Sequence, residues 1–288
     1  MTLVELMIAM ALSSFAIAAI VMAFRSQDAS SLLQETMTDM QQNNSSAIYI
    51  MAKELRMAGY DPTENGTSPP TAGYDLTALL PGVIPANTIA MLTATDTTIR
   101  FTADLNGDGD VDDPSGTADE DPNEDITFGF RTVDDADGNG IADAGVAELR
   151  RGTGGGMAAM AENIEAVNFA YAYDANGDGD LETTAGNTIW AFNSGGTWFN
   201  LDSNADGTID AQDDTDGDGV NIGVTTGDAF DINDIRAVKV WVLARSDRAD
   251  TRYTNSNTYV VGRQVITPGD RFYRRLLSTT VTCRNLGM

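Results

Sequence analysis

The chain has 288 residues, with 43 acidic and 17 basic side chains, a formal net charge of −26 and no histidine. This acidity argues against nucleic-acid binding, because a phosphate backbone requires a basic surface. Without histidine the chain cannot form a Ser-His-Asp triad, a Cys-His pair or a His-ligated zinc site, and we expect it not to be an enzyme. Cys283 is the only cysteine, so no disulfide can form within the chain, and we expect its thiol to be a small apolar core group.

Residues 1–24 form an apolar segment, MTLVELMIAMALSSFAIAAIVMAF, in which Glu5 is the one charged side chain. The segment is long enough to cross a bilayer, which takes about 20 apolar residues, and it ends at Arg25. A cleaved secretory signal would need a basic region before the apolar stretch, and this segment has none. Because an ionised carboxylate in hydrocarbon costs several kcal/mol, we expect Glu5 to have a partner.

No glycine or proline occurs before Gly59, which predicts one unbroken helix over about residues 1–58. In its second half the apolar residues recur at steps of three, four and seven, which predicts that one face packs on a core. This stripe consists of Leu33, Met37, Met40, Ala47, Met51, Leu55 and Ala58. Gly59 is expected to cap the helix, and Pro62 prevents its continuation.

After Pro62 the chain changes to short segments with alternating, β-branched residues, which predict strands. The predicted strands cover residues 88–94 and 97–103 as a hairpin, then 124–133, 145–152, 164–174, 235–246 and 272–286. In the last of them Leu277, Val281 and Cys283 share one face. The sequence therefore predicts an α+β fold, with a long helix packed on an antiparallel sheet. We expect an apolar unit at 1–24, one globular unit at 25–288 and no further independent domain.

Four segments of the sequence form a further pattern: TLVELMIAMAL at 2–12, IYIMAKELRMAGYDP at 48–62, RGTGGGMAAMAENIEAVNFAYAYD at 151–174 and DRFYRRLLSTTVTCRNL at 270–286. They resemble the type IV pilins and pseudopilins, and in particular the PilW-type minor pilins. The resemblance implies a pilin fold, with a turn and short helix before the strand at 164–174. It also implies that a leader is cut before Met1, that the new amine is methylated, and that Glu5 pairs with the amine of a neighbouring subunit. Such pairing is physically reasonable, since two buried charges are tolerable together and costly singly.

Two features depart from the pilin pattern. Residue 1 is Met where the family usually has Phe, and no proline lies near position 22, where the pilin helix usually kinks. The Ser13-Ser14 pair is the one weak point in this half of the helix.

The resemblance implies a subunit that lies in the inner membrane of a bacterium before it assembles into an extracellular filament. Its partners would be copies of itself or other pilins, the pilus assembly machinery and the prepilin peptidase. A type II secretion pseudopilin and a calcium-dependent adhesin on a pilin anchor are the alternatives. A carboxylate-based glycosidase is disfavoured, because the acids lie in turn-like motifs rather than opposed across an apolar cleft.

Five acidic loops form the second pattern in the sequence. Each follows the spacing Asp-x-Asp/Asn-x-Asp/Asn-Gly, in which alternate oxygen ligands can wrap a hard cation and glycine permits the sharp turn. The motifs are Asp104, Asn106, Asp108 and Gly109 (loop 1); Asp135, Asp137, Asn139 and Gly140 (loop 2); Asp174, Asn176, Asp178 and Gly179 (loop 3); Asp202, Asn204, Asp206 and Gly207 (loop 4); and Asp214, Asp216, Asp218 and Gly219 (loop 5). We expect them to bind several structural Ca2+ ions.

Loop 4 is the most complete motif, with Thr208 for a carbonyl ligand, Asp210 at the ninth position and Asp213 at the twelfth. Further candidate ligands are Asp110 and Asp112 in loop 1, Asp143 in loop 2, and Asp180 and Glu182 in loop 3. Without paired flanking helices, the loops resemble dockerin- or thrombospondin-type calcium loops rather than EF-hands. The alternative is that they are solvated turns. Against it, carboxylates at this density repel one another without a counter-ion.

Overall fold

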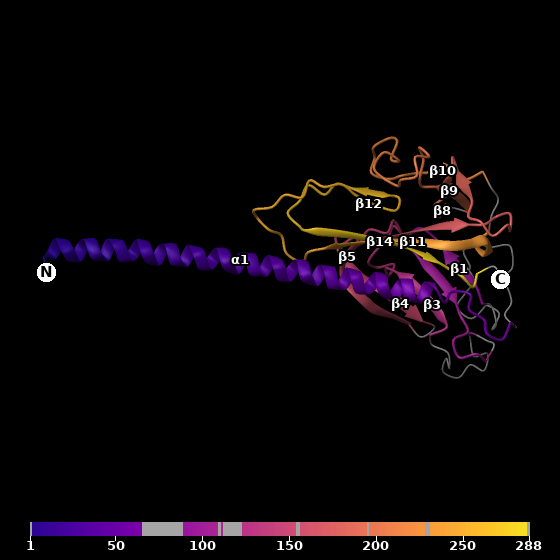
Figure 1. Ribbon diagram of the computed structural model, residues 1–288, viewed down its shortest axis with the longest axis horizontal. Coiled ribbons are helices and arrows are strands. Elements are labelled where there is room, and N and C mark those ends of the chain that lie inside the picture. The colour runs from indigo at the N-terminus through magenta and orange to yellow at the C-terminus, as the bar shows by residue number, and fades with distance from the viewer. Residues whose placement is uncertain are drawn as a thin grey trace.

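The computed structural model describes residues 2–64, 89–108, 111, 123–153, 156–194, 196–227 and 231–286, with the main chain alone at 29 and 30. One long helix projects from a globular part that contains all the described strands (Figure 1). This confirms the predicted α+β class.

Helix α1 (Leu3–Leu55) runs without a break for 53 residues, or about 80 Å at 1.5 Å per residue. The hydroxyls of Ser13 and Ser14 donate to main-chain oxygens three residues earlier, within the helix. The helix ends three residues before the predicted position 58, and a turn follows. Gly59 lies in this turn at φ +74°, where a Cβ would meet Leu286 at 2.6 Å, so glycine is required there.

The C-terminal half of α1 packs on the sheet through the predicted stripe. Met40, Ala47, Met51 and Leu55 are buried, whereas Met37 is 43% exposed. The stripe was predicted to begin at Leu33, and it is fully buried only from Met40 because the globular part covers the helix from there on.

Ten strands of the described part form one antiparallel sheet, in which neighbours follow the order β1-β2-β3-β4-β5-β8-β9-β10, and β11 joins β5 to β14. Their bounds are β1 (Met91–Ala94), β2 (Ile99–Thr102), β3 (Asp125–Gly129), β4 (Ala147–Thr153), β5 (Gly156–Tyr173), β8 (Ala191–Ser194), β9 (Thr197–Asn200), β10 (Val224–Thr225), β11 (Ile235–Arg245) and β14 (Arg274–Thr282). Two small hairpins lie outside this sheet, β6 (Thr183–Thr184) with β7 (Asn187–Thr188) and β12 (Tyr259–Val261) with β13 (Gln264–Ile266), and a 3-10 helix, η2, spans Ile232–Asp234. All predicted strands are present, and the 88–103 hairpin is formed by β1 and β2.

The predicted short helix before residue 164 is wrong, because residues 156–164 belong to strand β5; residues 154 and 155 of the predicted turn lie outside the described residues. Gly156 and Met157 pair with Thr153 and Gly152 of β4, so β5 starts eight residues earlier than predicted. Ala, Met and Glu at 157–162 are good helix formers, but pairing with β4 supplies interstrand hydrogen bonds that outweigh this weak local preference.

The sheet separates two apolar layers. Between α1 and the sheet, Met51 and Leu55 pack with Phe101, Phe169 and Val240 in the main core. On the opposite face a smaller cluster contains Trp241, Leu243 and Phe192, with the β12–β13 hairpin over it. The hairpin approaches β5 so closely that a Cβ on Gly262 would lie 2.0 Å from the side-chain oxygen of Asn168.

Two polar groups are built into these layers. Asn44 of α1 is fully buried, and its Nδ2 donates to the main-chain oxygens of Val242 at 3.2 Å and Arg275 at 2.9 Å. Arg274, whose side chain is 2% exposed, donates two hydrogen bonds to Glu165 and two to Asp270. Asn44 therefore attaches the helix to β11 and β14, and Arg274 attaches β14 to β5.

Cys283 follows β14 in the core, at 1% exposure, which confirms its predicted place among the apolar groups. Burial raises the pKa of its thiol to about 12, so the thiol stays protonated at neutral pH.

Candidate functional site

The first half of α1 projects away from the sheet (Figure 1), and its apolar side chains are uncovered. Leu3 is 75% exposed, Phe15 76% and Met22 72%, although such side chains are usually buried. Within the described part of the chain, α1 is the one helix long and apolar enough to cross a membrane. Its most apolar stretch is not buried by any other part of the described chain. This surface requires lipid or other protein chains to cover it.

Glu5 lies in the first turn of α1. Thr2 is the N-cap, its hydroxyl accepts from the Glu5 amide at 3.3 Å, and the Glu5 carboxylate accepts from the Thr2 amide at 2.9 Å. This reciprocal capping box was missed in the sequence, although Thr-x-x-Glu is its signature. Met1 lies outside the described residues, so the predicted pairing of its amine with Glu5 stays a prediction.

Loops 2 to 5 share one local conformation. In each, the first Asp accepts a hydrogen bond from the amide of the motif glycine: Asp135 from Gly140 at 2.9 Å, Asp174 from Gly179 at 3.0 Å, Asp202 from Gly207 at 2.8 Å, and Asp214 from Gly219 at 2.9 Å. These glycines have φ between +82° and +92°, which a side chain rarely permits. The predicted need for glycine at the sixth position is therefore confirmed in these four loops.

In loop 1 the structure adds a ligand candidate that lies outside the motif. Carboxylate oxygens of Asp104, Asp108 and Glu124 lie within 4.8 Å of one another. Glu124 is 2% exposed, and its Oε1 accepts from the amides of Leu105 at 2.6 Å and Asn106 at 2.9 Å. The sequence spacing of the loop motif does not include Glu124. The pairing of β2 with β3 brings Glu124 beside loop 1. The predicted ligands Asp110 and Asp112, with the motif glycine Gly109, lie outside the described residues.

Loop 5 gathers its carboxylates in the same way, since oxygens of Asp214, Asp216 and Asp218 lie within 4.8 Å of one another. Among the described residues, only these three and the loop 1 group bring three carboxylates so close. Both groups have the hard oxygen donors that Ca2+ prefers.

Loop 4 is arranged differently, although its motif is the most complete. Asp213 is 1% exposed, and its Oδ1 accepts from the Ser203 amide at 2.8 Å while Oδ2 accepts from the Asp210 amide at 2.9 Å. The carboxylate that was predicted as the twelfth ligand thus closes the loop on itself. Each carboxylate oxygen retains a second lone pair for a cation. The Thr208 amide donates to the Asp206 carboxylate at 2.8 Å, and the Asp206 amide donates to the Asn204 side-chain oxygen.

The remaining predicted ligands lie in loops 2 and 3. Asp137 accepts from Asn139, and Asp143 accepts from the Ala136 amide at 2.9 Å. In loop 3, Asp178 accepts from the Asp180 amide at 2.9 Å, and Glu182 accepts from Asn176 at 3.0 Å. Burial raises the pKa of Asp135, and the nearby Asp137 carboxylate contributes to this rise.

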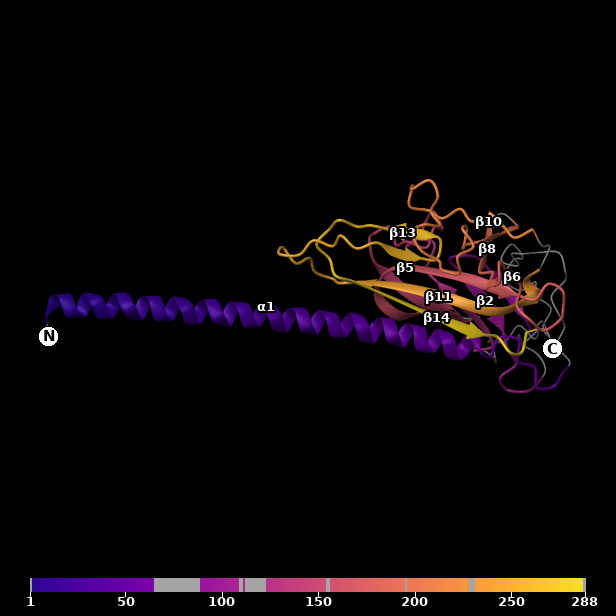
Figure 2. The same ribbon diagram turned by 45° about the horizontal axis from the view of Figure 1, so that its top comes forward.

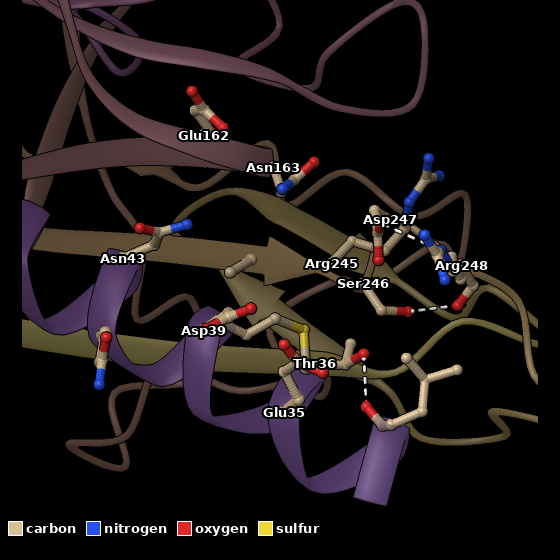
Figure 3. A pocket seen from close by; sticks show the side chains of 14 residues that line it. Glu35, Thr36, Asp39, Asn43, Glu162, Asn163, Arg245, Ser246, Asp247 and Arg248 are labelled. Atoms are coloured by element: carbon tan, nitrogen blue, oxygen red, sulfur yellow. Dashed lines mark hydrogen bonds and ion pairs between the residues drawn. The ribbon is translucent and has the colours of Figure 1, made fainter. Parts of the chain in front are cut away.

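A polar groove of about 450 Å³ lies where α1 leaves the globular part (Figure 3). Glu35 and Asp39 line it from the helix, Glu162 from β5, and Arg245 and Arg248 from the end of β11 and the loop that follows. Pockets for small molecules are mostly apolar with a few polar groups, and this groove is lined mainly by charged and amide side chains of both signs.

A long helix with an uncovered apolar half, joined to an antiparallel sheet by its other half, defines a pilin-like protein. The family model of the type IV pilus-assembly protein W, PilW, matches residues 135–285, just over half of the chain, and the chain belongs to this family. The matched residues include loops 2 to 5 and the strands from β4 to β14, so the N-terminal pilin motif is a separate sign of the same family. The chain is thus a pilus-related subunit, and its family is a structural one.

The comparison with solved structures includes a type IV-like pilin of Thermus thermophilus. It is 13% identical, covers 89% of this chain and 98% of its own, and has a TM-score of 0.32. No curated protein matches the sequence.

Proposed function

We propose that the chain is a minor structural subunit of a type IV pilus or related filament, held in the inner membrane of a bacterium before assembly. The single observation that carries this proposal is the uncovered apolar half of α1 in a member of the PilW family. Burying one large apolar side chain contributes about 1.5–3 kcal/mol relative to water, so this segment must lie in lipid or against other pilin helices. Prepilin peptidase would cut a leader just before Met1, and the new amine of Met1 would then be methylated.

Glu5 has a role in assembly under this proposal. Its carboxylate would pair with the N-terminal amine of an incoming subunit, because two opposite charges tolerate a low-dielectric core together. The capping box supports this role, since it anchors Glu5 at the start of the helix, next to residue 1.

Two substitutions separate pairing from capping. Glu5→Gln retains a side-chain oxygen for the capping box and removes the charge, whereas Glu5→Ala removes both. We expect both variants to remain in the membrane and to be lost from sheared extracellular filaments, with Glu35→Ala, an exposed carboxylate on the same helix, as the unaffected control. Incorporation of Glu5→Gln at the normal level would show that charge pairing is not needed. Recovery of the unaltered chain only from membranes, in cells that make pili, would refute the subunit role and favour an anchored binding module.

We further propose that Ca2+ stabilises the acidic loops. The supporting observations are the close carboxylates of loops 1 and 5 and the shared conformation of loops 2 to 5. Without a cation such carboxylates repel one another. Extracellular calcium sites bind at about 10⁻⁴–10⁻³ M, which suits a structural role outside the cell.

Calcium binding to the folded state alone should raise its stability. At ten times Kd, one site contributes about 1.4 kcal/mol, from RT ln(1 + [L]/Kd). We expect chelation to lower the Tm of the full chain in detergent and Ca2+ to restore it. The pair Asp214→Asn with Asp218→Asn should remove part of this shift, and the matched pair Asp247→Asn with Asp250→Asn, outside the loops, should not. A Tm that does not change up to several millimolar Ca2+ would leave the loops as solvated turns.

A further inference from the structure

We propose that the open edge of β14 is a second contact between subunits, at which a second copy of this chain adds an acidic extended segment to the sheet. This inference rests on the proposed filament role and names a contact within the globular part. It concerns residues Leu276–Thr282, far from the apolar half of α1.

The pairing of β14 with β11 shows which of its main-chain groups are unused. Ser246 donates its amide to Tyr273 at 2.9 Å, and Cys283 donates to Arg236 at 2.8 Å, so the odd-numbered residues of β14 bond to β11. The amides and carbonyls of the even-numbered residues therefore point to the other edge. No strand of the described chain pairs with that edge, and β14 is the outermost of the three strands β5, β11 and β14 (Figure 2).

Among the described residues, nothing gives this long edge the usual protection. Its even-numbered residues are Leu276, Ser278, Thr280 and Thr282, and the last three are exposed. Proteins usually guard an open edge with lysine, proline, a bulge or a covering segment. The segment Leu276–Thr282 has no charge and no proline, and its register with β11 has no bulge. Helix α1 packs on one face of the sheet, where Asn44 reaches both β11 and β14. Threonine occurs three times in this segment, and it is a residue type favoured in paired strands.

Basic side chains border both ends of the edge. Arg275 lies at its start and Arg284 just beyond its end, and both are exposed. The Asn285 side chain donates to the main-chain oxygen of Arg56 at 3.1 Å, so the end of α1, which also carries exposed Lys53, lies beside Arg284. No ion pair links Arg275, Arg284 or Lys53 to a carboxylate of the described chain.

The chain itself carries the complementary charge. Residues 152–235 contain 16 acidic and no basic side chains, whereas residues 236–288 contain ten basic and three acidic ones. One copy can therefore present its acidic segment to the basic edge of the next. If the β14 edges of two copies paired with each other, the basic side chains at their ends would instead lie close together. Contact between different surfaces of identical subunits produces an open filament rather than a closed dimer, so this contact agrees with filament growth.

Photo-crosslinking in cells that produce the full chain tests the contact. A benzophenone amino acid replaces Thr280, and an equal mixture of isotope-labelled and unlabelled copies distinguishes crosslinks between copies from those within one. The control position is Val133, which is 75% exposed and lies away from β14. We expect the Thr280 position to yield a crosslinked peptide from residues 152–235 of a second copy. A yield no higher than at Val133, a crosslink within one copy, or a crosslink to a different protein would overturn the proposal.

Substitutions at Ser278 show whether the main chain makes the contact. Its amide points to the open edge, so Ser278→Pro leaves the β11 ladder intact and removes one edge donor. We expect Ser278→Pro to lower the crosslink yield about tenfold, equivalent to about 1.4 kcal/mol, while Ser278→Ala has no effect and the Tm of both variants is unchanged. Equal yields for the two variants would exclude strand addition. Sheared and membrane fractions are analysed in parallel, so absence from filaments tests the proposed function separately from the edge contact.

Discussion

Replacing Arg274 by methionine should test the buried ionic network that Arg274 forms with Glu165 and Asp270. The guanidinium lies between Glu165, at 2.5 and 2.9 Å, and Asp270, at 2.6 and 2.7 Å, with only 2% of the Arg274 side chain exposed. The substitution retains most of the apolar stem but leaves the Glu165 carboxylate, 9% exposed, as an uncompensated buried charge. Removing one partner of such a pair costs about 3–5 kcal/mol.

The assay is urea unfolding of the full chain in mild detergent, followed by the fluorescence of its three tryptophans, all of which lie in the globular part. The matched control is Arg252→Met, because the Arg252 side chain is 71% exposed and its partner Asp250 lies 3.8 Å away; a change of about 0.5 kcal/mol or less is expected. The double variant Arg274→Met with Glu165→Leu should recover most of the loss, since no buried charge remains. A loss for Arg274→Met as small as that of the control would refute the buried-charge argument.

The network also predicts a pH dependence. The hydrogen bonds from Arg274 hold the pKa of Asp270 below its usual value. A carboxyl group with a lowered folded pKa contributes stability above its unfolded pKa, near 4, and this contribution is lost as the pH falls through the folded pKa. Arg274→Met should therefore lose stability less steeply than the unaltered chain below about pH 4.

Three further experiments test the packing described above. Asn44→Ala should cost about 1–3 kcal/mol, because two main-chain oxygens lose their buried donor, and exposed Gln42→Ala should be nearly neutral, with urea unfolding as the measurement. Gly262→Ala should lower Tm more than Gly269→Ala, since both glycines have φ near +60° but only the first would clash, at 2.0 Å; equal shifts would exclude the clash. The Cys283 thiol, with its pKa raised to about 12, should resist alkylation at pH 8 until the protein unfolds, and rapid labelling of the native chain would contradict its burial.

Several features of this protein follow from its sequence, because their determinants lie within a few residues of one another. The absence of glycine and proline before Gly59 predicted α1, and the three- and four-residue spacing predicted a buried face, which is confirmed from Met40 onward. The acidic loops were predictable for the same reason, since the first Asp and the motif glycine that donates to it are five residues apart.

Only the tertiary structure decided the contacts that join distant segments. Glu124 reaches loop 1 because β3 lies beside β2, and the Ala- and Met-rich start of β5 is extended because β4 offers it a pairing edge. Asn44 occurs within an otherwise apolar stripe because strands some 200 residues away present two oxygens to it. The composition of β14 predicted a strand, but not that one of its edges has no partner strand among the described residues, since strand order depends on long-range pairing that local preference does not encode.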